Sequence, residues 1–248
     1  MITLKSEGEI EVMRRGGKIL KEALHAASEK VKPGITTREI DLFIDNHITS
    51  QGAEPGFKKV KGYSWASCIC VNEQIVHTPP SKRIINNGDI VTIDAGVFYQ
   101  GLHTDSAYTV QAGTQTPEMQ RFLAVGKEAV RRAISVAKKG KRIGDISLAF
   151  QHTIEEAGYS IVPELTGHGV GKELHENPFI PCFLDRPVEK TPRLEEGMTL
   201  ALEVMYCTGD GRMTYEDGKW SIITADGSIA ASFEHTVAIT KNGTLILT

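Results

Sequence analysis

The sequence predicts an α+β fold made of two similar halves, each with two amphipathic helices followed by a pair of strands. Two observations support this prediction. Apolar residues recur at helical spacing behind helix-start signals, whereas other runs alternate apolar and polar residues, as half-buried strands do. The second half of the chain also repeats the pattern of the first half, although few residues are identical.

Four helices are expected from local start and stop signals. Two capping boxes of the type Ser/Thr-x-x-Glu, at residues 6–9 and 36–39, begin the helices of the first half. The second of these helices should stop at Gly52, since glycine favours the left-handed conformation that ends a helix. In the second half, Pro117 lies just inside the start of a third helix, and the fourth ends at Gly158.

The internal repeat is visible in the helices and again in the strands. VKPGITTREI at residues 31–40 aligns with AKKGKRIGDI at residues 137–146, an offset of 106 residues. The following strands correspond as well, because residues 88–94 and residues 197–203 both read glycine, five residues and an acid. We therefore expect a pseudo-twofold relation that brings an acid from each half to a similar place.

A chain of 248 residues can hold one large domain or two small ones, and we expect a single domain over residues 1–248, with pseudo-repeats at about 6–112 and 117–242. The hydrophobic fraction of 40% and the charged fraction of 24% are ordinary for a soluble globular protein. A net charge of −3 provides no general attraction to nucleic acid or to an anionic membrane. The charged N-terminus lacks the apolar segment of a secretory signal, so we expect a cytoplasmic protein. We also expect it to be a monomer.

The segment GDIVTIDAGVFYQGLHTDSAYTV, residues 88–110, carries two aspartates on adjoining strand-like runs. If the chain turns at Tyr99 and Gln100, Asp94 lies directly opposite Asp105. Like charges that face each other across an antiparallel pair are destabilising. The pattern therefore indicates that a cation compensates the two carboxylates.

Two further acids, Glu203 and Glu234, interrupt strand-like runs in the second half. A single acid on a strand usually marks a solvated face or an edge. Four such acids, with no lysine or arginine on the same runs, instead predict bound metal ions, because an unpaired buried carboxylate is costly.

Histidine is a common companion of carboxylates in metal sites, and LTGHGVGKELHENP offers His168 and His175. The glycines around His168 suit a close approach of the backbone to a ligand. Each histidine alone is more often structural, and His77 in VNEQIVHTPP is equally ambiguous. His103 and His235 alternate to the face opposite their neighbouring acids and receive no role.

Together these residues resemble the pita-bread metallopeptidases, and within them the type I methionine aminopeptidases. The resemblance covers essentially the whole chain, and its most specific pieces are GHGVG-x-x-LHE-x-P, the glutamate strand after EGM and the closing EHT. The 31 residues from Glu203 to Glu234 leave no room for the long insertion of the type II enzymes. The resemblance implies two pseudo-twofold-related halves around a curved antiparallel sheet.

The resemblance implies a five-ligand site for two divalent ions, drawn from Co, Mn, Fe(II) and Zn. Asp94 would bind one ion with both oxygens, while Asp105 and Glu234 would bridge the pair. His168 and Glu203 would complete the ligands of the second ion. A water molecule activated between the ions would then hydrolyse the bond after the initiator methionine of nascent chains.

The resemblance also assigns catalytic and substrate-binding roles. Glu203 would act as the general base, and His175 would donate a hydrogen bond to the scissile carbonyl oxygen. His77 would contact the peptide or relay a proton to the leaving amine. Both histidines would thus touch the substrate, and the methionine pocket would be lined by Tyr63, Cys68 and Trp220.

Several residues depart from the usual pattern of this family. Val60 and Leu174 stand where an aromatic residue is common, and Val204 follows the glutamate ligand in place of proline. Thr78-Pro79-Pro80 replaces the usual glycine-x-proline after the first histidine, and the two prolines stiffen this loop. These departures concern the pocket and its entrance, and therefore the strictness of the methionine preference.

Three alternatives remain open from the sequence. An X-Pro aminopeptidase or dipeptidase of the same fold usually carries a preceding domain, for which 248 residues leave no room. A pita-bread binding module would have lost ligands, whereas all five positions are filled here. In an unrelated α/β protein, the acids would lie on solvated strand faces. The expected partners are peptide and nascent-chain N-termini, with a transient ribosomal contact and neither nucleic acid nor membrane.

Overall fold

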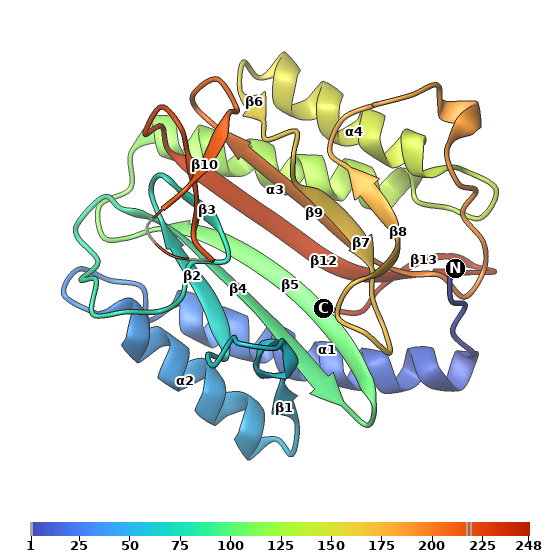
Figure 1. Ribbon diagram of the computed structural model, residues 1–248, viewed down its shortest axis with the longest axis horizontal. Helices are drawn as coiled ribbons and strands as arrows, with labels where there is room; N and C mark the ends of the chain where they lie inside the picture. The colour runs from blue at the N-terminus through green and yellow to red at the C-terminus, as the bar shows by residue number, and fades with distance from the viewer. Residues whose placement is uncertain (1, 217, 219) are drawn as a thin grey trace.

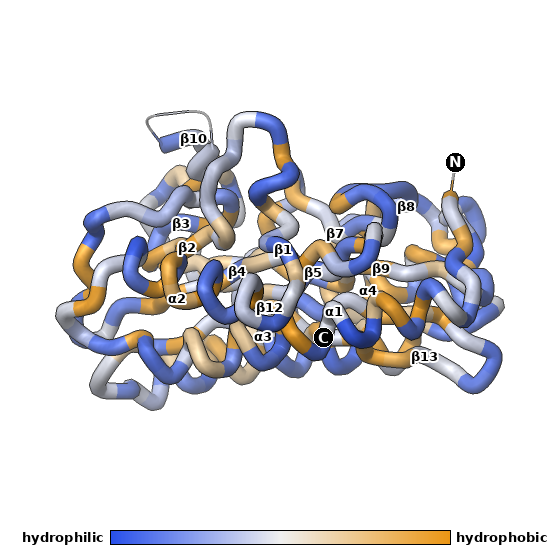
Figure 2. The backbone as a smooth tube through the Cα atoms, turned by 90° about the horizontal axis from the view of Figure 1, so that it is seen from below, coloured by the Kyte–Doolittle hydropathy of each residue, from blue (hydrophilic) through white to orange (hydrophobic). Residues whose placement is uncertain are grey.

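The computed structural model describes residues 2–216, 218 and 220–248 (Figure 1). Long antiparallel strands form a curved surface with the four helices packed behind it, two behind each half. The view at right angles shows α1 and α3 below β4 and β5, and β3 and β10 above them (Figure 2). Among the helices of the described ranges, none combines the length and hydropathy that a membrane span requires.

The helices of the first half begin at the two predicted capping boxes. Helix α1 (Glu7–Ser28) starts behind Ser6, and α2 (Thr37–Ser50) starts behind Thr36. Each cap side chain accepts a hydrogen bond from the backbone of a glutamate three residues on, whose carboxylate accepts one in return. Gly52, with φ of +75°, follows the end of α2 as expected.

The helices of the second half also match the prediction. Helix α3 (Pro117–Val136) has Pro117 at its first position, behind the side-chain cap of Thr116. Helix α4 (Ile143–Glu156) ends two residues before Gly158, whose φ is +85°. The helices of both halves bury their apolar faces against the strands, which forms one core in each half.

Within the described residues, the strands form two large sheets and one small sheet. The first sheet contains β1 (Glu54–Pro55), β2 (Ser67–Val71), β4 (Ile90–Tyr99) and β5 (Leu102–Gln111). The second contains β6 (Ser160–Ile161), β7 (Thr166–Gly169), β8 (Glu176–Pro181), β9 (Thr199–Cys207), β12 (Ala230–Thr240) and β13 (Gly243–Ile246). The small sheet contains β3 (Gln74–Val76), β10 (Met213–Tyr215) and β11 (Ile222–Thr224). Two 3-10 turns, Gly56–Lys59 and Val188–Lys190, complete the chain.

The register of the β4–β5 hairpin corrects the prediction. The turn residues are Gln100 and Gly101, with φ of +48° and +89°, so the predicted turn lies one residue too early. A two-residue hairpin turn of this kind requires positive φ at both positions, and glycine at the second position lowers the cost. Asp94 therefore faces Ala107, and Asp105 lies two residues away along β5. The aspartates are diagonal neighbours on one face and not directly opposite.

Side-chain hydroxyl groups join the two large sheets where β5 and β12 lie side by side (Figure 1). Ser106 Oγ donates to the Glu234 carbonyl oxygen at 2.8 Å. Thr236 Oγ1 donates to the Asp105 carbonyl oxygen at 2.7 Å and accepts from the Asp105 backbone N–H at 2.9 Å. This seam fixes an acid of the first half beside an acid of the second half.

Candidate metal centre and substrate cavity

A cavity opens over the seam between the two halves. The structure brings together in its wall all ten site residues named from the sequence: Tyr63, Cys68, His77, Asp94, Asp105, His168, His175, Glu203, Trp220 and Glu234. The first aspartate comes from β4 and the second from β5, while β9 and β12 provide the two glutamates. The acids therefore do not lie on solvated outer faces, which removes that alternative.

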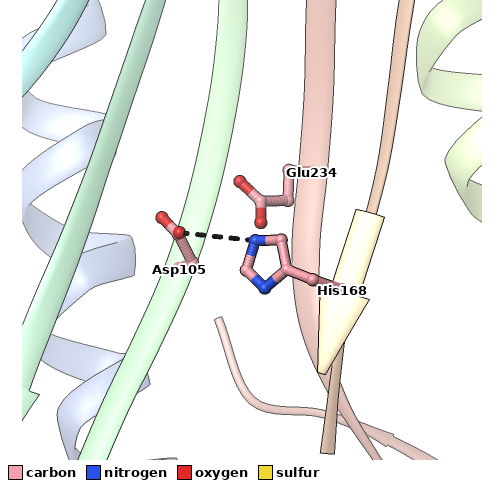
Figure 3. Close-up of side chains that lie close together, drawn as sticks. All are labelled: Asp105, His168 and Glu234. Carbon is pink, nitrogen blue, oxygen red and sulfur yellow. Dashed lines mark ion pairs between the residues drawn. The ribbon is translucent and has the colours of Figure 1, made fainter. Parts of the chain in front are cut away.

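Asp105, His168 and Glu234 form a tight group in the cavity (Figure 3). One ligand atom from each lies within 4.8 Å of the others, and all three residues are buried. His168 Nε2 is 4.0 Å from Asp105 Oδ2 and 3.5 Å from Glu203 Oε1. Oxygen and nitrogen atoms at these separations can converge on a cation between them.

The tautomer of His168 suits a metal ligand. Its Nδ1 lies 2.8 Å from the Gly169 carbonyl oxygen, which can only accept, so Nδ1 carries the proton. The Nε2 lone pair consequently points toward the carboxylates, and burial lowers the pKa of His168 to about 3, which keeps the ring neutral. A lone pair facing carboxylate oxygens is repulsive unless a cation lies between them.

The carboxylates of the cavity lack compensation by protein groups. Burial raises the pKa of Asp94 to about 7 and holds the pKa values of Asp105, Glu203 and Glu234 well above their usual range; the neighbouring acids add to the rise for those three. Asp94 Oδ1 and Glu234 Oε1 are buried without a hydrogen-bond partner among the described residues. No lysine or arginine of the described ranges lines the cavity. These residues fit divalent cations, which would neutralise the charge and use the free oxygen atoms.

The glycines around His168 lie where backbones pack closely. A Cβ atom on Gly167 would lie 2.6 Å from the Ala201 carbonyl oxygen on the neighbouring strand β9. A Cβ atom on Gly169 would collide with the backbone of Asn177, at the β8 end of the loop. Glycine is therefore needed because the backbones around His168 pack closely, and this packing holds the imidazole in the cavity.

The two other predicted histidines lie at the cavity wall outside the tight group. The His175 ring stacks edge-on against His168, with ring centroids 4.4 Å apart and an interplanar angle of 70°. His77 follows β3 directly and has a φ of +60°, a left-handed conformation that few residues other than glycine adopt. Both side chains remain exposed and accessible to a substrate.

The apolar end of the cavity is built from aromatic packing. Tyr63 and Trp220 meet edge-on with ring centroids 5.1 Å apart, and Tyr63 is buried beside Cys68. The Tyr63 hydroxyl donates to the Ser67 carbonyl oxygen at 2.8 Å, and burial raises the pKa of Tyr63, so the ring stays neutral. The result is a slot suited to an uncharged side chain.

Sequence reasoning missed two kinds of contributor. Phe57 and Val76 line the cavity, although the short segments that contain them carry no periodic signal. Lys5 forms a nearly fully buried ion pair with Glu176, the residue after His175. The side chains of the pair are 2% and 8% exposed, so the N-terminal segment anchors the loop that carries His175. Nothing local in the sequence indicates this pair, because its members are 171 positions apart.

Comparison with known proteins decides the family. The model of metallopeptidase family M24 matches residues 11–241. The chain belongs to this family. The family assignment and the pita-bread fold predicted from the sequence are thereby confirmed, and membership together with the Asp105–His168–Glu234 group supports the use of divalent metal.

Relatives of this M24 chain match it over its full length. A methionine aminopeptidase of Clostridium perfringens is 42% identical over 248 residues, which cover 100% of this chain and 99% of the relative. The crystal structure of the methionine aminopeptidase from Thermotoga maritima has a TM-score of 0.96 at 38% identity and covers 100% of this chain and 99% of that one. The prolidase from Pyrococcus furiosus has a TM-score of 0.78 at 26% identity. This match covers 99% of the present chain but 65% of the prolidase chain.

Proposed function

We propose that residues 1–248 form a single catalytic domain that removes the initiator methionine from nascent proteins and peptides. One observation carries this proposal: four carboxylates and a neutral imidazole without cationic partners lie at the base of a partly apolar cavity. The full-length similarity to methionine aminopeptidases supports the choice of substrate. The proposal includes action in the cytoplasm as a monomer, with a transient contact to the ribosome, where nascent N-termini emerge.

The metal-holding residues of this proposal are Asp94, Asp105, His168, Glu203 and Glu234. Their oxygen and imidazole donors suit Co, Mn, Fe(II) or Zn, and four carboxylates provide enough negative charge for two such ions. When bound, the ions supply Lewis acidity and make water a nucleophile near neutral pH. The free α-amino group of the peptide would also be attracted to this acidic pocket, which explains action at N-termini alone.

The remaining chemistry belongs to side chains of the cavity. Glu203 keeps part of its carboxylate exposed to the cavity and would accept the proton of the attacking water, then deliver it to the leaving amine. His175 would donate a ring N–H to the scissile carbonyl oxygen as negative charge develops there. His77 would contact the peptide or relay a proton to the leaving amine.

The apolar slot would bind the methionine side chain. Tyr63, Cys68 and Trp220 provide its walls. Leu174 and Val60, which are smaller than the aromatic residues common at their positions, line the same space. An unbranched thioether fills an irregular apolar slot without leaving polar groups unpaired. Selectivity would therefore come from shape and from the absence of hydrogen-bonding groups that a polar side chain would need.

Peptide hydrolysis by metal-depleted protein, reconstituted with single divalent metals, tests the proposal. We expect release of free methionine from Met-Ala-Ser only after metal addition, and little hydrolysis of Gly-Pro-Leu. Faster cleavage of Gly-Pro-Leu would identify an X-Pro peptidase of the same fold. Absence of both activities with every metal, in protein that binds metal, would contradict catalysis and favour a binding module.

A further inference from the structure

Two loops at the rim of the cavity are joined by a buried hydrogen bond between Thr78 and Ser221. Their hydroxyl oxygens are 2.8 Å apart, and both residues are buried. Thr78 follows His77, and Ser221 follows Trp220, so the bond connects the immediate neighbours of two cavity-lining residues. Thr78 is also the residue that replaces the glycine usual after the first histidine.

Glu216 fixes the direction of this bond. Its Oε2 atom accepts from Ser221 Oγ at 2.6 Å and from Gln74 Nε2 at 2.8 Å. Because a carboxylate only accepts, the single proton of Ser221 goes to Glu216, and the Thr78 hydroxyl must donate to Ser221. Gln74 lies on β3, which leads directly into the His77 loop. The hydrogen bonds that pass through Glu216 and Ser221 therefore begin at Gln74 and end at Thr78, both within a few residues of His77.

The backbone of the His77 loop depends on such support. The positive φ of His77 persists only where neighbouring contacts hold it. Pro79 restricts Thr78 to an extended backbone, and the Thr78 carbonyl oxygen accepts from the Ile69 backbone N–H at 3.0 Å. Thr78 is thus fixed from both sides, and its hydroxyl is presented to Ser221.

The opposite loop carries one wall of the apolar slot. Trp220 packs edge-on against Tyr63, and a Cβ atom on Gly62 would lie 3.8 Å from the Trp220 ring. Two residues later, β11 begins and pairs with β3 at Ile222 and Val76. Between that pairing and Trp220, Ser221 makes the side-chain contact that ties the tryptophan to the His77 loop.

We propose that Thr78 and Ser221 are positioning residues that determine side-chain specificity. Their hydrogen bond holds the Trp220 side chain, which forms one wall of the apolar slot, at a fixed distance from the His77 loop. The width of the slot then accepts an unbranched side chain and rejects branched or aromatic ones. The selection of methionine in this inference rests on the proposed function, whereas the coupling of the two loops does not.

The coupling is tested by the fluorescence of Trp220. The chain has two tryptophans, so Trp65→Phe leaves Trp220 as the single emitter. In that background Thr78→Val removes the hydroxyl at nearly constant shape, and Thr78→Ser retains it. We expect Thr78→Val to increase acrylamide quenching of Trp220, whereas Thr78→Ser leaves it at the parent value. Equal quenching in the three proteins would overturn the inference.

The specificity is tested by kcat/KM for Met-Ala-Ser and Leu-Ala-Ser with Mn²⁺-loaded, full-length protein. We expect Thr78→Val and Ser221→Ala to reduce the preference for methionine by roughly two- to tenfold, the factor that corresponds to one neutral hydrogen bond. The change should lie in KM for the methionine peptide, and Thr78→Ser should restore the preference. An equal loss for both peptides, or a loss accompanied by loss of metal, would overturn the specificity role.

The two readouts separate this inference from the proposed function. If the parent protein releases no methionine but Thr78→Val raises the quenching, the proposed function fails and the coupling stands. If the parent releases methionine and neither quenching nor preference responds, the inference fails alone. Thermal melting of each variant confirms that folded protein is compared, and Ser221→Ala is the second variant should Thr78→Val not fold.

Discussion

The hairpin of the first half and the corresponding strand pair of the second half contribute the same chemistry with different geometry. Strands β4 and β5 are connected by two residues, and their acids are diagonal neighbours. Strands β9 and β12 are connected by residues 208–229, and Glu203 lies directly opposite Glu234. The repeat therefore preserves an acid on each central strand but not the register or the connection.

The difference between the connections shows how the two halves divide the work. The tight turn of the first half places no residue in the cavity, whereas the long connection of the second half holds β10, β11 and Trp220. Both halves provide carboxylates, which need only reach the seam between β5 and β12. A cavity wall that faces the substrate requires a longer segment between the paired strands. The second half has such a segment at residues 208–229, between β9 and β12.

The largest effect is expected from Glu203, which we propose as both ligand and base in the second half. Glu203→Gln should lower kcat for Met-Ala-Ser by a factor on the order of 10²–10⁴, because proton transfer is lost. Metal content and methionine release measure the result. Asp210→Asn, on an exposed loop of the same half, is the control and should match the parent. Normal turnover in Glu203→Gln would contradict the assignment.

His175 separates turnover from metal binding. His175→Ala should retain the metal content of the parent protein, while kcat falls by a factor on the order of 10²–10³, because the carbonyl oxygen loses a hydrogen-bond donor. Elemental analysis and initial rates measure the two quantities. His152→Ala, an exposed helical histidine, serves as the control. Loss of metal along with activity would show that the proposed role is wrong.

The β7–β8 loop of the second half should depend on the N-terminal segment. Lys5→Met leaves the Glu176 carboxylate buried without its partner, which should lower the free energy of unfolding by about 3 kcal/mol. Urea denaturation measures this change. Lys139→Met breaks the exposed pair with Glu196 and should cost less than about 1 kcal/mol. Equal costs for the two variants would contradict the anchoring role of Lys5.

The smallest expected effect concerns pH and the metal-free protein. Burial raises the pKa of Asp94 to about 7 and that of Glu203 above its usual range, so the folded protein retains protons that the unfolded chain releases near about pH 4. The contribution of these protons to the free energy of unfolding is fully present below about pH 4 and is lost as the pH rises through about 7. The melting temperature of EDTA-treated protein should therefore fall by a few degrees between pH 5 and pH 8.

Divalent metal and charge-removing variants sharpen this pH prediction. Mn²⁺ should restore the melting temperature at pH 8, because the cation replaces the protons. Without metal, Glu203→Gln should raise the melting temperature at pH 8 more than Asp94→Asn does, since the glutamates face each other directly and the aspartates do not. Equal gains would indicate that the different registers have no energetic consequence.

Local signals in the sequence accounted for most of the fold. Capping boxes at Ser6 and Thr36 located two helix starts to the residue, because a cap and its glutamate are three positions apart. The β4–β5 turn was misplaced by one residue, because the pattern gives no preference between neighbouring turn positions until the positive φ of Gln100 and Gly101 is known. Strand position was thus predictable, but strand register was not.

The sequence by itself determined the helices, the strands that carry the acids and the types of side chain available for a metal centre, because these depend on short-range patterns and on residue chemistry. Only the tertiary structure decided how the side chains meet. The seam between β5 and β12, the Lys5–Glu176 pair and the Thr78–Ser221 bond each join residues more than 120 positions apart. Such contacts arise when the two halves pack together, and no periodicity within either half encodes them.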